Sequence, residues 1–143
     1  MKPVDERILE FITEHHVLTL AVTGSDGPWC ASCFYVYLPE KNRFVFTSDP
    51  DTKHIREFVA GNDSRVAGTI ALETKITGKI RGVQFAGPMK ELYGRDLEEA
   101  KAAYLERFPI ARLAKLFLWG AEPDIIKMTD NRLGFGKKLI WQK

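Results

Sequence analysis

One segment, residues 43–58, brings together side chains that bind anions. An apolar run ends in two hydroxyls, a turn follows, and a helix then begins with a hydroxyl, a lysine and a histidine. These side chains are Thr47, Ser48, Thr52, Lys53 and His54. Because the first turn of a helix presents unpaired N–H groups and a partial positive charge, phosphate groups bind there favourably. The segment therefore predicts a site for a phosphate-bearing cofactor.

The same pattern also has a purely structural interpretation. Thr is a common helix N-cap and Pro-Asp is a common turn, so Pro50 to His54 are also typical of a capped surface helix. Such caps far outnumber phosphate sites. The local pattern by itself therefore favours the structural interpretation.

The cysteines and the paired histidines indicate neither a redox centre nor a metal site. Cys30 and Cys33 stand three residues apart in a strand-like run, so their side chains point to opposite faces, which opposes a shared disulfide or metal ion. The sequence has no second cysteine pair to complete a zinc site. His15 and His16 are adjacent at the end of a predicted helix, where a favourable contact with the helix C-terminus is expected. We expect two reduced cysteines and no metal ligands.

The composition is typical of a globular protein that binds neither nucleic acid nor membrane. Of 143 residues, 45% are hydrophobic and 28% are charged, and 21 Lys+Arg against 19 Asp+Glu give a net charge of +2. No basic footprint for nucleic acid and no basic block for a membrane surface is present. The apolar runs are shorter than the ~18 residues of a membrane span, and the acidic start MKPVDER is unlike a signal peptide. We expect a cytoplasmic protein.

Helical and strand periods follow one another in blocks along the chain. The pattern predicts helices over residues 3–14, 52–60 and 96–108 and a short helix over 110–115. It predicts strands over residues 17–23, 29–38, 44–48, 65–73, 77–92, 116–119, 124–129 and 138–141. Asp96 and Glu99 form a capping-box start for the third helix. Gly82 and Gly87 inside the longest strand indicate a bulge or a close backbone approach.

This order of elements argues against a parallel sheet, because strands do not alternate one by one with helices. It predicts a β-dominated α+β fold, namely a small antiparallel barrel whose open ends are covered by helices. The first three strands are expected to form a meander. Residues 1–143 are expected to form a single domain, since no linker, repeat or low-complexity segment interrupts them.

The element order and the 44–54 segment resemble the pyridoxamine-phosphate-oxidase-like FMN-binding split-barrel superfamily. In that superfamily a strand ends in aromatic-Thr-Asn or a similar sequence, and Ser-Arg-Lys opens the next helix. Here Phe46-Thr47-Ser48-Asp49 and Thr52-Lys53-His54 hold those positions, and residues 81–87 echo the motif Arg-Gln-Val-Arg-Val-Glu-Gly. The chain most resembles the uncharacterised bacterial YhbP-like proteins, through residues 29–31, 34–35, 66–69, 80–85, 107–112 and 129–141.

This resemblance implies an antiparallel split β-barrel that forms a homodimer and binds FMN in clefts between subunits. The implied flavin contacts on one strand are Ser32, Cys33, Phe34 and Tyr35. Phe34 and either Trp119 or Trp141 are candidates to cover the isoalloxazine ring. Gln84 is the candidate for the polar edge of the ring, because it lies two residues beyond Gly82 at the oxidase's glutamine position and so shares its strand face.

The chain also departs from the superfamily pattern. His54 stands where relatives carry a permanently charged lysine, so phosphate affinity is expected to depend on pH near the ordinary histidine pKa of ~6.5. Lys53 replaces an arginine and provides a point charge instead of a bidentate fork. The oxidase's C-terminal substrate signature has no counterpart at residues 131–134. Oxidation of pyridoxamine phosphate is therefore not carried over.

Two functional classes follow from this sequence. The first is a flavin-dependent oxidoreductase of unknown substrate that exchanges electrons with small-molecule donors or acceptors. The second is a non-catalytic binder or carrier of FMN, haem or another anionic cofactor, and a haem site would need one of only three histidines as an accessible ligand. An empty cleft that serves as an interaction module is a third alternative. No side chain is assigned a catalytic role.

Overall fold

The computed structural model of the protein describes residues 2–143, which form a closed ring of six antiparallel strands with a two-stranded extension. The strands of the ring are β1 (Val17–Gly24), β2 (Gly27–Leu38), β3 (Arg43–Thr47), β4 (Arg65–Ala71), β5 (Arg81–Glu91) and β6 (Leu118–Ala121). They pair in the order β4-β1-β2-β3-β6-β5, and the pairing of β4 with β5 closes the barrel. The predicted antiparallel barrel and the β1-β2-β3 meander are confirmed.

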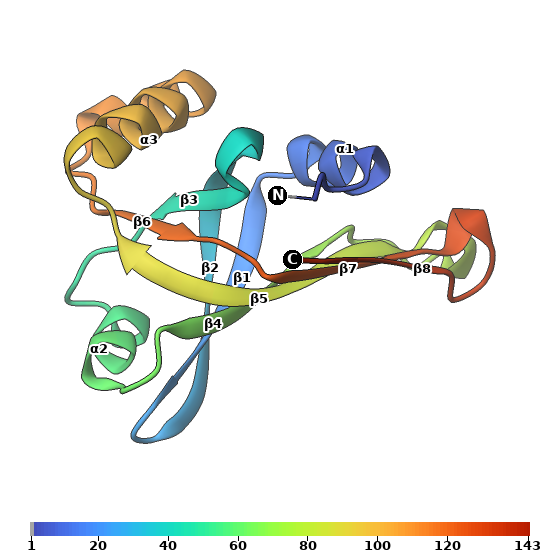
Figure 1. Ribbon diagram of the computed structural model, residues 1–143, viewed down its shortest axis with the longest axis horizontal. Helices are drawn as coiled ribbons and strands as arrows, with labels where there is room; N and C mark the ends of the chain where they lie inside the picture. The colour runs from blue at the N-terminus through green and yellow to red at the C-terminus, as the bar shows by residue number, and fades with distance from the viewer. Residues whose placement is uncertain (1) are drawn as a thin grey trace.

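Two further strands continue the sheet beyond the barrel. β5 pairs with β7 (Ile125–Asp130), and β7 pairs with β8 (Lys138–Gln142). Figure 1 shows this β7–β8 hairpin running beside β5 and past the barrel. The outer surface of the molecule therefore includes a six-stranded sheet face formed by β2, β1, β4, β5, β7 and β8.

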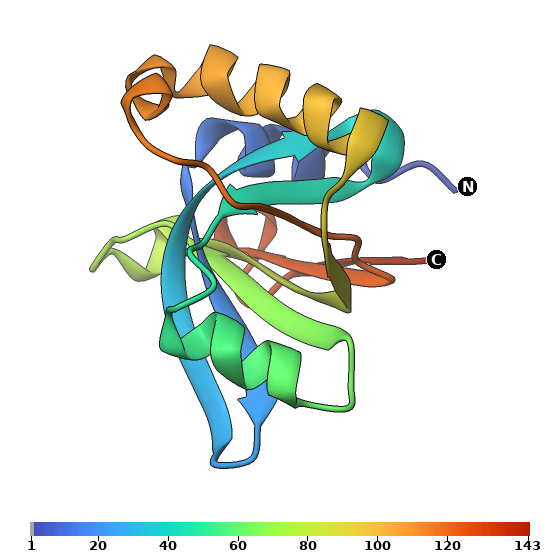
Figure 2. The ribbon, with the colours of Figure 1, turned by 90° about the vertical axis from the view of Figure 1, so that its left-hand side faces the viewer.

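Three α-helices flank the barrel, as predicted. They are α1 (Glu6–Glu14), α2 (Lys53–Ala60) and α3 (Gly94–Arg107), and the short 3₁₀ turns are η1 (Pro39–Lys41), η2 (Thr77–Lys79), η3 (Pro109–Leu113) and η4 (Asn131–Leu133). Helices α1 and α3 lie on one side of the barrel and α2 on the opposite side (Figure 2). Helix α2 packs against β1 and β2, and α3 packs against β2, β3 and β6.

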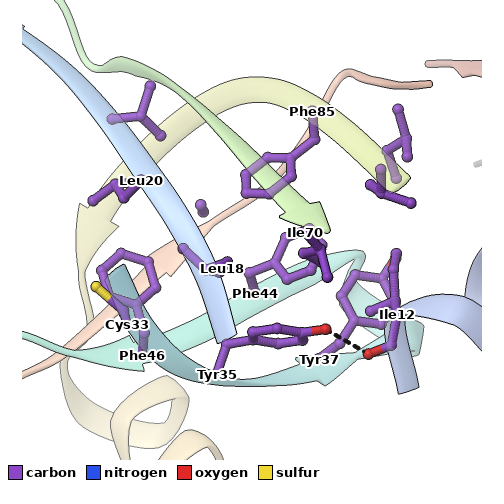
Figure 3. Packing of buried hydrophobic residues seen from close by; sticks show 14 of the residues in the cluster. Ile12, Leu18, Leu20, Cys33, Tyr35, Tyr37, Phe44, Phe46, Ile70 and Phe85 are labelled. Carbon is purple, nitrogen blue, oxygen red and sulfur yellow. Dashed lines mark hydrogen bonds between the residues drawn. The ribbon is translucent and has the colours of Figure 1, made fainter. Parts of the chain in front are cut away.

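The core fills the barrel with aliphatic and aromatic side chains from alternate strand positions. Along β4, for example, Val66, Gly68 and Ile70 are buried whereas the residues between them are exposed. Figure 3 shows Tyr35 and Phe44 among the packed rings, and the Tyr35 hydroxyl donates a 2.6 Å hydrogen bond to the Ile12 carbonyl oxygen. This bond satisfies a buried hydroxyl, and it also links α1 to the barrel interior.

The predicted capping box of the third helix is wrong. Helix α3 begins at Gly94, two residues before Asp96, and no side chain caps it. The Asp96 carboxylate accepts a 2.7 Å hydrogen bond from Lys41, and Glu99 accepts a 2.6 Å bond from the same lysine. The two carboxylates that the local pattern assigned to the helix N-terminus therefore form tertiary ion pairs with Lys41.

The longest predicted strand, residues 77–92, contains a turn and a close approach. Its first residues form η2, and the β4–β5 ladder closes where Leu72 N donates to the Arg81 carbonyl oxygen at 3.2 Å. At Gly87 an added Cβ would lie 2.3 Å from the Glu122 carbonyl oxygen, so the expected close backbone approach is confirmed there. An added Cβ at Gly82 would make only an ordinary 3.4 Å contact.

Candidate functional site

The end of strand β3 is tied to β6 by its own hydroxyl and backbone groups. Thr47 Oγ1 accepts a 3.0 Å hydrogen bond from the Phe117 amide, and Ser48 N donates to the Phe117 carbonyl oxygen at 3.0 Å. The Ser48 carbonyl oxygen accepts from Trp119 Nε1 at 3.0 Å. This register fixes the position of both hydroxyl residues where β3 leads into α2.

Ser48 is the centre of a buried polar cluster with His54 and Cys33. His54 Nε2 lies 2.9 Å from Ser48 Oγ, and Cys33 Sγ lies 3.7 Å from the same oxygen. Burial lowers the pKa of the His54 imidazole and raises the pKa of the Cys33 thiol. Both groups therefore favour their neutral forms, and the buried His54 contributes no cation to the surface.

Lys53 is the cation of the predicted phosphate segment, and acidic and aromatic neighbours hold it. Its Nζ lies 3.4 Å from Glu57 Oε1 and 3.8 Å from Asp26 Oδ2. The same ammonium lies 4.9 Å from the centre of the Trp29 ring. Lys53 is thus directed at the β1–β2 hairpin, and its charge is balanced within the chain.

Thr52 is the N-cap residue of α2, but its side chain does not cap the helix. Thr52 Oγ1 donates a 2.7 Å hydrogen bond to the Asp49 carbonyl oxygen, and Asp49 Oδ1 accepts from the Asp51 amide at 2.8 Å. The structure therefore brings Thr47, Ser48, Thr52, Lys53 and His54 to one corner of the fold, with each side chain hydrogen-bonded or ion-paired inside the chain.

The implied flavin contacts on β2 divide between the two faces of the strand. Cys33 and Tyr35 point into the core, whereas Ser32 and Phe34 point outward. Phe34 is 59% exposed, and its ring centre lies 5.5 Å from that of Phe108 beyond the end of α3. Cys30 is exposed and Cys33 is buried, so the two thiols lie on opposite faces of β2.

Only one of the three candidate aromatic covers is accessible. Trp119 and Trp141 are buried, and their indole N–H groups donate to the carbonyl oxygens of Ser48 and Lys2. Within one chain, Phe34 is the candidate ring that can contact a planar cofactor.

Gln84 lies on the same outer sheet face as Ser32, three strands away. The pairs Ser32–Thr19, Thr19–Thr69 and Thr69–Gln84 form one row across β2, β1, β4 and β5. At about 4.8 Å per strand, Gln84 is about 14 Å from Ser32 along the sheet. Gln84 is exposed, so its amide is free to meet a group from outside the chain.

The outer sheet face around this row is lined by small side chains. The adjacent row consists of Cys30, Ala21, Ala67 and Ala86. Ala67, Thr69 and Gln84 are exposed, whereas Thr19, Ala21 and Ala86 are partly buried. A flat face of small residues permits the close approach of a planar ligand or of another sheet.

Sequence reasoning missed the acidic surroundings of Lys53. Glu57 stands four residues after Lys53, a spacing that by itself indicates an ion pair on one helix face. The contribution of Asp26 had no comparable signal, because the β1–β2 hairpin brings it there from 27 positions earlier in the chain.

The adjacent residues His15 and His16 make different contacts. His15 Nδ1 lies 2.7 Å from the Phe11 carbonyl oxygen near the end of α1, in agreement with the expected contact at the helix C-terminus. His16 is exposed, and its ring centre lies 6.2 Å from that of Phe108. No cluster of three or more His, Cys, Asp or Glu side chains suited to a metal ion occurs between residues 2 and 143.

The helices of the described chain are also too short or too polar to cross a membrane.

Solved structures define the fold class of the chain. It resembles a pyridoxamine 5′-phosphate oxidase-related, FMN-binding protein from Nostoc punctiforme, with a TM-score of 0.71 at 12% identity over 100% of this chain and 92% of that one. An FAD-binding protein from Mesorhizobium loti aligns with a TM-score of 0.68 at 16% identity over 89% and 93% of the two chains. A heme-binding protein from Mycobacterium smegmatis gives 0.77 at 20% identity over 99% of this chain, which spans 59% of that protein. The fold is therefore that of the pyridoxamine-phosphate-oxidase-like split barrels.

Sequence relatives define the family more narrowly. The chain is 41% identical over 133 residues to a UPF0306 protein from Klebsiella pneumoniae, covering 93% of this chain and 89% of that one. It is 40% identical over 134 residues to the UPF0306 protein YhbP from Escherichia coli O157:H7, covering 94% and 90%. The chain belongs to the UPF0306 family, in agreement with the YhbP-like resemblance of its sequence. No protein-family model matches it.

Proposed function

We propose that the protein binds FMN in a cleft between two copies of the chain and acts as a flavin-dependent oxidoreductase on a small-molecule substrate. The observation that carries this proposal is the outer face of β2, where Phe34 and Ser32 are exposed beside a flat sheet of small residues. Names of structural neighbours include FMN-, FAD- and heme-binding proteins, which supports a cofactor-binding role. The proposed location is the cytoplasm, with a small-molecule electron donor or acceptor as partner.

A homodimer completes the proposed site. Within one chain, Gln84 lies about 14 Å from Ser32, too far for both to contact one edge of an isoalloxazine ring. When two outer faces meet about a twofold axis, Gln84 of a second copy can approach the ring that Phe34 of the first copy covers. The shape and hydrogen-bonding groups of such a face suit a planar and mostly apolar ring system, and Lys127 is the charged residue that pairs with Gln84.

The phosphate of FMN is assigned to the start of α2. Lys53 provides the cation once it leaves Glu57, and the first-turn amides and the hydroxyls of Thr47 and Ser48 provide further donors. Thr52 joins them once its hydroxyl leaves the Asp49 carbonyl oxygen. His54 acts as a positioning residue through its 2.9 Å contact with Ser48 Oγ. Bound FMN would supply the electron transfer, whereas the protein orients the ring and excludes water from one face.

The direct experiment is a visible spectrum of the purified protein, recorded before and after addition of micromolar FMN. A bound flavin that is bleached by NADH or NADPH without oxygen supports the oxidoreductase. A bound flavin that stays oxidised with every reductant supports a carrier instead. The absence of FMN binding would contradict both.

A charge-matched pair of variants tests the phosphate assignment. Lys53→Gln should weaken the binding of FMN by about ten-fold or more, because a charged hydrogen bond to the phosphate is lost. The binding of riboflavin, which has no phosphate, should change little. Lys75→Gln removes an exposed lysine for which no ion pair is found among residues 2–143, and it should leave both ligands unchanged. Equal losses for FMN and riboflavin in Lys53→Gln would place the phosphate elsewhere.

A non-catalytic haem binder is the second candidate, and His16 is the observation that favours it. Its imidazole is exposed beside the ring of Phe108, and its pKa is lowered by partial burial and by the nearby charges of Arg107 and His15. A neutral imidazole is the form that ligates haem iron. If the protein binds haemin, His16→Ala should abolish the Soret shift, whereas His15→Ala should retain it.

A further inference from the structure

A cavity between α3, η3 and β6 lies outside the proposed cofactor site. Its volume is about 420 Å³. Leu97 and Leu105 from α3 line it together with Leu116 and Leu118 from the chain entering β6. Leu97, Leu116 and Leu118 also belong to or pack against the small second core that attaches α3 to the barrel. The cavity is therefore an apolar space that the packing of α3 leaves partly open.

Three cations surround this apolar space. Lys101 stands between Leu97 and Leu105 on one face of α3, at a spacing of four residues on either side. Arg112 and Lys115 from η3 and the chain after it also line the cavity, and all three side chains are exposed. Among residues 2–143, none of the three forms an ion pair, and no carboxylate lines the cavity. In contrast, Lys41, Arg43 and Lys53 are all paired with carboxylates.

We infer that this cavity binds an amphiphilic anion, namely an unbranched aliphatic carboxylate whose chain lies on the leucines and whose head group contacts Lys101, Arg112 or Lys115. Charge complementarity selects the head group, because three cations without carboxylate partners favour an anion. The leucine surfaces select the tail, because each methylene removed from water strengthens binding. Space of this size is typical of small-ligand sites.

The cavity is separate from the residues assigned to FMN. None of Ser32, Phe34, Thr47, Lys53 or Gln84 lines it. Thr47 pairs with Leu118 across β3 and β6, and the Phe34 ring contacts Phe108 beyond the end of α3. The inference does not depend on flavin binding, so the two proposals can fail independently.

Titration calorimetry with the full chain tests the ligand class. The probes are hexanoate, octanoate, decanoate and dodecanoate below their micelle concentrations. Affinity should rise with chain length by up to about four-fold per methylene until the cavity is filled. The alcohol and the trimethylammonium compound of equal chain length should bind more weakly. Equal affinity for all three head groups, or no binding by any carboxylate, would overturn the proposal.

Variants locate the site. Arg112→Gln combined with Lys115→Gln should weaken decanoate about three- to ten-fold. The control Lys75→Gln with Arg95→Gln removes the same charge from exposed positions outside the cavity and should change affinity less than two-fold, within the usual effect of distant surface charges. All four positions are exposed, so circular dichroism should report an unchanged fold. If both double variants weakened decanoate binding equally, the effect would come from net charge alone, which would contradict the proposed site.

Two further measurements complete the test. Decanoate should shift the NMR amide signals of Ala111 and Ala114, which line the cavity, and leave those of Thr69 and Gln84 unchanged. Shifts centred on the outer sheet face would overturn the proposed location. FMN or haemin should not compete with decanoate, and competition would assign the cavity to the cofactor site.

Discussion

At the scale of single residues, the polar side chains of the phosphate segment already have partners within the chain. Lys53 pairs with Glu57 and Asp26, and His54 is buried against Ser48. Binding of a phosphate at this corner therefore has to exchange one set of contacts for another. Affinity becomes a difference between two electrostatic arrangements, and single substitutions should move it in either direction.

Glu57→Gln should strengthen FMN binding. The Glu57 carboxylate competes with a phosphate for Lys53, and its second oxygen is buried without a hydrogen-bond partner. Removing the competing charge should raise FMN affinity about two- to five-fold and leave riboflavin unchanged. Parallel titrations of both ligands measure this effect. Glu73→Gln is the matched control on an exposed site, and weaker FMN binding by Glu57→Gln would show that Lys53 does not meet the phosphate.

His54 should make the stability of the fold depend on pH. Burial lowers the pKa of His54 in the folded state, so the unfolded chain binds more protons as pH falls below the ordinary value of about 6.5. The free energy of unfolding should therefore be highest above that pH and should decrease toward acidic pH. Urea unfolding at several pH values measures this dependence.

The His54→Gln variant should flatten that pH dependence in the acidic range. His16→Gln should retain most of it, because His16 is exposed at the surface. An identical profile for wild type and His54→Gln would show that the Ser48–His54 contact does not couple to protonation.

At the scale of elements, tertiary contacts decide how strands and helices end. Helix α3 begins at Gly94 without a side-chain cap, and Asp96 and Glu99 in its first two turns contact Lys41 instead. Arg43, itself buried, joins the same network through Asp96 at 3.3 Å and also pairs with Glu122 at 2.7 Å. Ion pairs that connect β3, α3 and the β6–β7 connection thus replace local capping, and they place α3 along the wall of the cavity described above.

Gly87→Ala should destabilise the barrel. The added Cβ would lie 2.3 Å from the Glu122 carbonyl oxygen and 2.7 Å from Pro123 Cα, both backbone atoms that must move. The expected loss is about 1–3 kcal/mol in the free energy of unfolding. Gly82→Ala on the same strand meets only a 3.4 Å contact and should change stability by less than about 0.5 kcal/mol. Denaturant unfolding measures the free energy of unfolding of both variants. Equal losses of this free energy would contradict a steric cause at Gly87.

At the scale of the whole molecule, the outer face of the six-stranded sheet carries the row from Ser32 to Gln84. Ser32, Thr69 and Gln84 in this row are exposed and Thr19 is partly buried. Helix α2 lies on one side of the barrel and α1 and α3 lie on the other (Figure 2). The proposed dimer and the proposed flavin site both depend on this face, and they should be lost together.

Ala67→Arg should therefore shift the protein toward a monomer and weaken FMN binding. A charged side chain in the middle of a small-residue sheet face prevents close approach of a second copy and leaves a charge unpaired. Ala102→Arg adds the same charge on an exposed position of α3 and should keep the oligomeric state. Analytical ultracentrifugation and flavin titration measure the two effects. A wild-type protein that is monomeric at all concentrations would contradict the dimer proposal.

Much of this protein could be predicted from its sequence. Period-two alternation, as in β4, and the 3.6-residue period of α1 are local properties of side-chain direction, so the order and types of the elements followed from the residues themselves. The resemblance of the 44–54 segment and of the chain as a whole extended this to the split barrel. The opposite faces of Cys30 and Cys33 also followed from strand geometry.

The state of the candidate site was decided by tertiary structure. Whether Lys53 is free depends on Asp26, and whether His54 is charged depends on its burial beside Cys33, contacts between residues far apart in the chain. The leucine-lined cavity beside Lys101 likewise exists only because α3 packs against β6. Sequence periodicity fixes which way a side chain points from its own backbone, whereas its electrostatic partners and its exposure to solvent are set by the elements that fold against it.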